Sequence, residues 1–307
     1  MNARFDVLVA GEINPDLIIS GDVEPAFGQV EKLVDEAVLT IGSSSVIFAC
    51  GAARLGLKVA FVGRCGDDLF GHFILDEMQH SGIDTSHVII VPGGSTGLSI
   101  ILDRRIDRAI LTYPGLIPTL QAKDLTDGLL KQARHLHVAS YFLQTNLQPD
   151  LYALFKRARS FGLSTSLDTN YDPSEVWRGV HDLFPVTNIF LPNEVEICSL
   201  TGTTTVEQAV SKLAEIIETL VVKQGTNGAV AVQAGTLVRA KALPVQVKDT
   251  VGAGDSFDAG FIYGYLNGWP LEKSLRLATV CGALSTRAVG GTRGQPTLAE
   301  ALEWMEE

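Results

Sequence analysis

The chain has 307 residues, 46% of them apolar, and its 24 basic and 35 acidic side chains give a formal net charge of −11. This length allows one large hydrophobic core, and the acidic balance disfavours nucleic acid as a partner. No run approaches the ~18 apolar residues of a membrane span. The four cysteines lack C-x-x-C spacing and are typical of reduced thiols. We therefore expect a cytoplasmic protein with neither nucleic acid nor a membrane as its partner.

In chain order, short apolar runs alternate with longer segments of helical periodicity. Two late runs, Ala229–Gln233 and Leu237–Ala240, predict an antiparallel hairpin at one sheet edge. The alternation favours an α/β fold, a three-layer α/β/α sandwich around a mostly parallel central sheet, with residues 1–307 as one domain. The other predicted strands are Phe5–Ala10, Val59–Val62, Leu136–Ala139, Leu163–Leu167, Ile189–Leu191 and Leu220–Val222, and the predicted helices between them are Val46–Leu55, Leu69–Ser81, Pro149–Phe161 and Val206–Glu218.

Two segments of the N-terminal half interrupt this alternation. Residues 16–41 contain short extended runs and no clear helix, and residues 96–113 predict two strands, Gly97–Leu102 and Arg108–Tyr113. We expect the two segments to meet as a small, discontinuous β-sheet lid over the active face, with ordinary surface hairpins as the alternative. Because exposed edge strands invite pairing, the lid also predicts a homodimer.

Polar or glycine-rich segments follow four of the predicted strands. They begin at Gly11, Asp168, Pro192 and Lys223. In open α/β sheets, ligands bind outside the carboxyl ends of the strands. The four segments therefore predict a ligand site on one face of the sheet.

The strongest local pattern is D-T-V-G-A-G-D-S-F at 249–257, and helical periodicity follows it. Gly252 and Gly254 permit a tight turn whose free amides, at the positive end of a helix, form an anion hole. Asp255 either caps this helix or takes a proton from an attacking hydroxyl. The dinucleotide motif G-x-G-x-x-G would need glycine where Phe257 stands, and a P-loop needs a Gly-Lys pair that the chain lacks.

These motifs resemble those of the ribokinase-like (PfkB-type) carbohydrate kinases over nearly the whole chain. D-T-V-G-A-G-D-S-F-D-A-G-F at 249–261 is similar to the family's C-terminal pattern, residues 42–71 partly match its N-terminal pattern, and N-E-V-E at 193–196 matches its N-x-x-E motif. The resemblance implies transfer of the γ-phosphoryl group of ATP to a primary hydroxyl of a small sugar or sugar-like molecule.

The resemblance also implies a role for each matching residue. Asp255 is expected to be the general base, and the amides of Gly252, Ala253 and Gly254 the anion hole. Asn193 and Glu196 would organise Mg²⁺ through water, and Asp249, with carbonyls near Val251 and Gly290, resembles a monovalent-cation (K⁺) site. The expected substrate side comprises Asn14, Asp16, Gly42, Ser43, Ser44, Ile47 and Asp168, and the expected nucleotide side comprises Lys223, Gly225, Thr226, Gly228, Thr279, Val280 and Ala283.

Two positions depart from the family pattern. Ser43 stands where a second glycine is usual, and Ile47 stands where an asparagine usually hydrogen-bonds the substrate. Isoleucine removes a donor and an acceptor together, so we expect a substrate that lacks the matching hydroxyl or carries an apolar group there. Two alternatives to a sugar kinase stay open: a nucleoside kinase of the same fold, and a nucleotide- or sugar-binding regulator without turnover.

Overall fold

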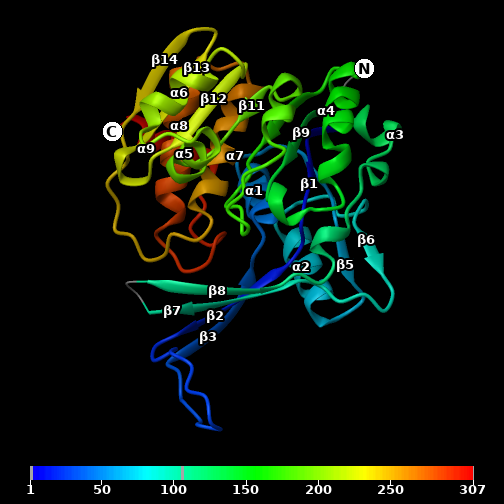
Figure 1. Cartoon of the computed structure of the whole chain (residues 1–307), viewed down its shortest axis with the longest axis vertical. Helices are drawn as coiled ribbons and strands as arrows, with labels where there is room; N and C mark the ends of the chain where they lie inside the picture. Colours follow the sequence, from blue (N-terminus) through cyan, green and yellow to red (C-terminus); the bar gives the residue numbers. More distant parts are fainter. Residues whose placement is uncertain (1–2, 105–106, 307) are drawn as a thin grey trace.

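The computed structural model describes residues 3–104 and 107–306. Its centre is an 8-stranded sheet in the order β14-β13-β12-β11-β10-β9-β1-β4 (Figure 1). Neighbouring strands from β12 to β4 pair in parallel, and β13 pairs antiparallel with both β12 and β14, as the predicted hairpin requires. The bounds are β1 (Phe5–Ala10), β4 (Val59–Val62), β9 (Ala133–Val138), β10 (Ser164–Leu167), β11 (Ile189–Phe190), β12 (Thr219–Lys223), β13 (Ala229–Gln233) and β14 (Thr236–Ala240).

Helices cover both faces of this sheet. Because side chains alternate along a strand, Val7 and Val9 of β1 enter one core, and Leu8 and Ala10 enter the other. The first core is closed by α1 (Ser44–Arg54), α2 (Leu69–His80), α7 (Ala253–Leu266), α8 (Leu271–Ser285) and α9 (Leu298–Glu306). The second is closed by α3 (Asp127–Leu130), α4 (Leu151–Ser160), α5 (Glu194–Thr201) and α6 (Val206–Leu213). The predicted three-layer fold is confirmed.

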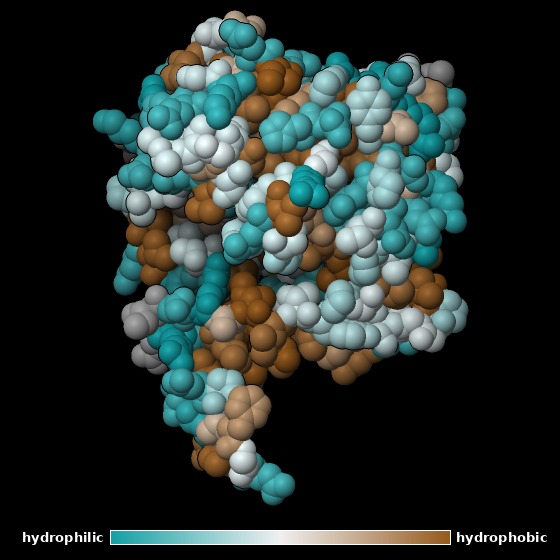
Figure 2. All heavy atoms as spheres, in the orientation of Figure 1, coloured by the Kyte–Doolittle hydropathy of each residue, from teal (hydrophilic) through white to brown (hydrophobic). Residues whose placement is uncertain are grey.

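The two segments that interrupt the alternation contribute the strands of one 4-stranded sheet, in the order β3-β2-β7-β8. Its strands are β2 (Pro15–Ser20), β3 (Glu36–Ile41), β7 (Leu98–Asp103) and β8 (Arg108–Tyr113). The sheet extends from the main body in Figure 1, and positions 105–106 of the predicted lid lie outside the described residues. The chain between β2 and β3 forms a protrusion with mixed polar and apolar surface (Figure 2), where Phe27 is 95% exposed.

Several elements differ from the prediction. The helix expected over Val206–Glu218 ends at Leu213, and Ile217 is buried in the turn that leads into β12. Helix α9 and the short paired strands β5 (Arg64–Gly66) and β6 (Ile89–Val91) were not predicted. Within the described ranges, no helix is both long and apolar enough to cross a membrane.

Candidate active site

A glycine turn begins α7 and shapes the predicted anion hole. Gly252 is the N-cap residue, with φ +72° in the left-handed region. A Cβ on Gly252 would lie 2.7 Å from Cα of Gly291 and 2.8 Å from Cγ2 of Ile47. The backbone conformation and the available space therefore both require glycine here.

The free amides of the first turn of α7 point out of the helix. Those of Gly254 and Asp255 donate to no acceptor within the described residues, whereas the amide of Ala253 bonds the carbonyl of Thr250 at 3.3 Å. A Cβ on Gly254 would meet only the side chain of Lys223, at 3.6 Å from Nζ. With the helix dipole behind them, the two free amides suit a phosphoryl oxygen.

Asp255 lies beside these amides and is only 7% exposed. The N-cap position belongs to Gly252, so Asp255 is not the N-cap of α7. Burial, followed by the charge of Asp168, raises the pKa of Asp255 to about 8, while Lys223 and a hydrogen bond with Ser44 act in the opposite direction. A carboxylate with a pKa near the working pH is suited to general-base chemistry.

A buried ion cluster lies behind Asp255. Nζ of Lys223, at the end of β12, is 2.7 Å from Oδ2 of Asp168 and 3.1 Å from Oδ2 of Asp258. Burial opposes ionisation of Asp168, but the charge of Lys223, followed by hydrogen bonds from Asp258 and Lys223, holds its pKa below the ordinary value. Burial raises the pKa of Asp258 well above the ordinary value. Asp168, expected on the substrate side, thus has Lys223 as its partner.

Polar groups on the acceptor side connect the end of β1 with the small sheet. Nδ2 of Asn14 donates to Oδ1 of Asp16 and to Oγ of Ser99 in β7, each at 3.3 Å. A Cβ on Gly42 would overlap Oδ1 of Asp16, so glycine there leaves space for the carboxylate. Burial raises the pKa of Asp16 to about 7. The group suits recognition of substrate hydroxyls.

The serine at the unusual position 43 is accommodated by local hydrogen bonds. Ser43 keeps a left-handed φ of +68°. Its Oγ donates to the main-chain carbonyl of Glu12 at 2.7 Å and accepts from the amide of Val46 at 3.1 Å as the N-cap of α1. The buried carboxylate of Glu12 also accepts from the hydroxyls of Ser45 and Ser140. These bonds offset the cost of positive φ.

Ile47 packs against the glycine turn. It is 3% exposed. Its side chain is what a Cβ on Gly291 would strike, and its Cγ2 is among the atoms that a Cβ on Gly252 would strike. Its carbonyl accepts from Nε2 of Gln295 at 2.9 Å. An apolar wall therefore stands beside the anion hole, where the family pattern usually has an amide.

A cavity of about 620 Å³ opens on the other side of the hole. Six of the seven residues expected around the nucleotide line it, together with Ala253 and Gly254. The seventh, Val280, is fully buried in the core between sheet and helices. The lining is Lys223, Gly225, Thr226, Gly228, Ala242, Leu243, Pro244, Val245, Val247, Thr250, Ala253, Gly254, Phe257, Thr279, Gly282, Ala283 and Thr286.

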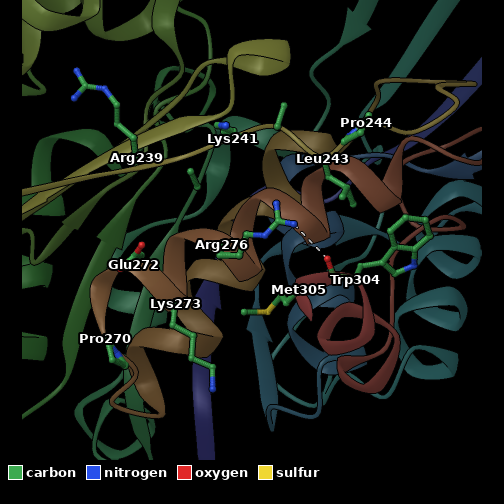
Figure 3. A pocket seen from close by; sticks show the side chains of 12 residues that line it. Arg239, Lys241, Leu243, Pro244, Pro270, Glu272, Lys273, Arg276, Trp304 and Met305 are labelled. Atoms are coloured by element: carbon green, nitrogen blue, oxygen red, sulfur yellow. Dashed lines mark hydrogen bonds between the residues drawn. The ribbon is translucent and has the colours of Figure 1, made fainter. Parts of the chain in front are cut away.

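The loop at 242–244 separates this cavity from a second hollow of about 1010 Å³ between β14, α8 and α9. In Figure 3, Arg276 extends across it toward Trp304 and donates to the carbonyl of that residue at 3.3 Å. Lys273 instead lies over the ring of Trp269. None of the predicted site residues lines the second hollow, so the first cavity is the candidate nucleotide site.

The two residues of the N-x-x-E motif form a capping box at the start of α5. Oδ1 of Asn193 accepts from the amide of Glu196 at 2.9 Å, and Oε2 of Glu196 accepts from the amide of Asn193 at 2.8 Å. Burial raises the pKa of Glu196 to about 7. One carboxylate and one amide suit Mg²⁺ held through water, because this ion keeps several of its waters.

Asp249 joins the two loops of the predicted monovalent-cation site. Its Oδ1 accepts from the amide of Val251 at 2.9 Å, and its Oδ2 accepts from the amide of Gly290 at 2.8 Å. Arg108 of β8 reaches to 3.8 Å from Oδ1. The carboxylate therefore ties the main chain just before the glycine turn to the loop at Gly290.

A model of the pfkB family carbohydrate kinases matches residues 5–298. The chain belongs to this family. A sugar kinase of Archaeoglobus fulgidus described as uncharacterized is 32% identical over 250 residues, 80% of this chain and 98% of that protein. The 5-dehydro-2-deoxygluconokinase of Geobacillus kaustophilus is 30% identical over 291 residues, 87% and 85% of the two chains. Arabidopsis thaliana ribokinase, solved with ribose and ATP, has a TM-score of 0.85 at 23% identity and 99% coverage of both chains, and so shares the fold.

This carbohydrate kinase also has site residues to which the sequence assigned no role. Glu12, Ser140 and Asn170 form a hydrogen-bonded chain, in which Nδ2 of Asn170 donates to Oγ of Ser44 at 2.7 Å. Asp258 follows Asp255 by three residues, so the two share a helix face. This spacing is the sequence signal for Asp258. Glu12 and Asn170 lie in polar segments that follow predicted strands, but their partners come from distant parts of the chain and could not be predicted.

Proposed function

We propose that this carbohydrate kinase transfers the γ-phosphoryl group of ATP to a hydroxyl of a small sugar or sugar-like molecule. The observation that carries the proposal is the position of Asp255. It is buried beside the free amides of α7, next to Ala253 and Gly254 of the 620 Å³ cavity lining, and it hydrogen-bonds Ser44 at the start of α1. A base next to a nucleotide cavity suits in-line transfer to a hydroxyl held beside it.

In the proposed step, the acceptor oxygen forms a bond to the γ-phosphorus as the bond between that phosphorus and the leaving oxygen of ADP breaks. The proton of the acceptor hydroxyl passes to the carboxylate of Asp255. The amides of Gly254 and Asp255 stabilise the charge on the phosphoryl oxygens, and Asn14 and Asp16 hold the substrate in line. General-base help of this kind is worth roughly 10²–10⁴-fold.

Mg²⁺ would bind near Asn193 and Glu196 through water and neutralise charge on the phosphates. Asp249 and the neighbouring carbonyls would hold K⁺. The residues fit these ions in chemistry, since carboxylate, amide and carbonyl oxygens are the ligands that hard cations take.

A substrate panel tests the proposal. ADP release is measured with ribose, fructose, 2-keto-3-deoxygluconate, 5-dehydro-2-deoxygluconate, adenosine and inosine, at fixed ATP and Mg²⁺. We expect saturable turnover with a sugar or sugar acid. Turnover with a nucleoside alone would favour the nucleoside kinase. Saturable binding of a sugar and ATP without ADP formation would favour the regulator and contradict the proposal.

The homodimer and the cytoplasmic location stay predictions. Strand β8 ends the small sheet and exposes apolar side chains, with Ile110 at 53%, Leu111 at 58% and Tyr113 at 56%. An edge of this kind invites a second copy. Light scattering that finds only monomer would remove the dimer.

A further inference from the structure

The cluster of Lys223, Asp168 and Asp258 joins three separate parts of the fold. Asp168 follows β10, Lys223 ends β12, and Asp258 lies in the first two turns of α7. The exposed fraction of the side chain is 3% for Asp168, 12% for Lys223 and 1% for Asp258. Nζ of Lys223 is within 3.2 Å of three carboxylate oxygens. A buried ammonium held this closely fixes α7 against the ends of two strands.

The ammonium also lies directly behind the anion hole. A Cβ on Gly254 would be 3.6 Å from Nζ of Lys223, and its three nearest atoms would all belong to this lysine side chain. The main chain of Lys223 also aligns the N-x-x-E motif. Its amide donates to the carbonyl of Pro192 at 3.0 Å, and Lys223 forms an isolated parallel β-bridge with Asn193. One residue thus contacts the elements that carry the base, the hole and the predicted magnesium site.

Apart from Lys223, the charged side chains that influence Asp255 are acidic. Glu12 faces it from the segment after β1 and Asp168 from the end of β10, and the charges of both oppose its ionisation. Among the described groups that influence Asp255, Lys223 is the cation. Removal of its charge would leave Asp255 facing carboxylates alone, and like charges favour the protonated form of a carboxyl group.

We propose that Lys223 is a positioning residue for phosphoryl transfer, which favours the ionised form of the base Asp255 and holds the first turn of α7 in place through Asp168 and Asp258. This inference rests on the proposed role of Asp255. It assigns Lys223 a task beyond bordering the nucleotide.

The charge balance of the cluster predicts shifts of defined sign. In Lys223→Met, Asp168 and Asp258 share one proton and keep a negative charge, so the pKa of Asp255 should rise by about one unit or more. In Lys223→Met/Asp168→Asn, the remaining Asp258 is protonated and the cluster is neutral again, so the pKa should return to about the wild-type value. If Lys223 had only a structural role, the second substitution would remove another bond and would not restore the pKa of Asp255.

The experiment measures Asp255 directly and does not require turnover. Protein labelled with carboxyl-¹³C aspartate is titrated by NMR, and the Asp255 signal is assigned by its loss in Asp255→Asn. The acidic limb of kcat/KM against pH is recorded in parallel with the best substrate of the panel. Lys212→Met is the matched control, because Lys212 lies exposed on α6 and its ammonium donates to the main-chain carbonyl of Thr201.

The inference is supported if the pKa of Asp255 rises in Lys223→Met and returns in the double variant. The acidic limb of kcat/KM should shift to higher pH and back in the same two variants. An unchanged Asp255 pKa in Lys223→Met would overturn the inference. If Lys223→Met fails to fold, Asp168→Asn/Asp258→Asn leaves the ammonium facing amides and should lower the Asp255 pKa by about one unit; no decrease would overturn it as well. If the NMR shifts appear but no substrate turns over, the proposed kinase function fails while the electrostatic coupling stands.

Discussion

Substitution of Gly252 by alanine should disrupt the anion hole more than any other single added methyl group at the site. The φ of +72° at Gly252 costs an L-residue roughly 1–2 kcal/mol. The new Cβ would also lie 2.7 Å from Cα of Gly291 and 2.8 Å from Cγ2 of Ile47. Such overpacking costs about 1–3 kcal/mol, so we expect a total destabilisation of about 2–5 kcal/mol.

Two matched variants separate the causes of this loss. Gly268 has a similar φ of +67° with nothing within 4 Å of an added Cβ, so Gly268→Ala should show the conformational cost alone. Gly254→Ala adds a methyl group that meets only Lys223 at 3.6 Å and should leave stability nearly unchanged. Urea unfolding gives the stability of each variant.

Activity provides the second readout for Gly252→Ala. The displaced turn moves the amides of Gly254 and Asp255, and loss of one such donor costs on the order of 10²–10³-fold in kcat. We expect that loss in the folded fraction, measured as ADP release. Stability equal to Gly268→Ala together with wild-type kcat would refute the reasoning about both space and function.

Two other predictions concern the base and the acceptor wall. The pKa of Asp255 is raised to about 8, and the ionised form is the active one. Below that pH, kcat/KM should therefore fall about tenfold per pH unit, and above it kcat/KM should level off. A midpoint near the ordinary aspartate pKa would contradict the assignment of Asp255 as the base. Ile47→Asn restores an amide beside Gly252, and discrimination between substrates with and without the matching hydroxyl should change by roughly 1–3 kcal/mol, or about 5–150-fold in the ratio of kcat/KM values across the panel. An unchanged ratio would mean that Ile47 does not face the substrate.

Local sequence patterns were enough to predict the fold and the glycine turn before α7, but not which amides of that turn are free: Ala253 was expected to be one of them, and its amide bonds the carbonyl of Thr250. The alternation of apolar runs and helical segments predicts a covered parallel sheet, and the two glycines before a helix predict free amides at α7. Both depend on residues close together in sequence. The end of α6 at Leu213 could not be read locally, because Ile217 continues the apolar pattern and is instead buried in the turn before β12.

The spacing of residues in the sequence could not predict side-chain partners that lie on different strands or helices. Lys223 was expected to border the nucleotide, but its bonds to Asp168 and Asp258 join residues 55 and 35 positions away. Val280 illustrates a different limit. Thr279 and Ala283 are four residues apart and share a face of α8, whereas Val280 is rotated by about 100° from Thr279 and points into the core.

The most direct test of the central claim is Asp255→Asn, which removes the base and nearly preserves the shape of the side chain. ADP release with the best substrate and the Kd for ATP are measured on the same preparation. The proposed mechanism predicts that kcat falls by roughly 10²–10⁴-fold while the Kd for ATP stays within a few-fold of wild type, because the nucleotide cavity does not include Asp255. Turnover close to wild type in this variant would contradict the assignment of Asp255 as the base.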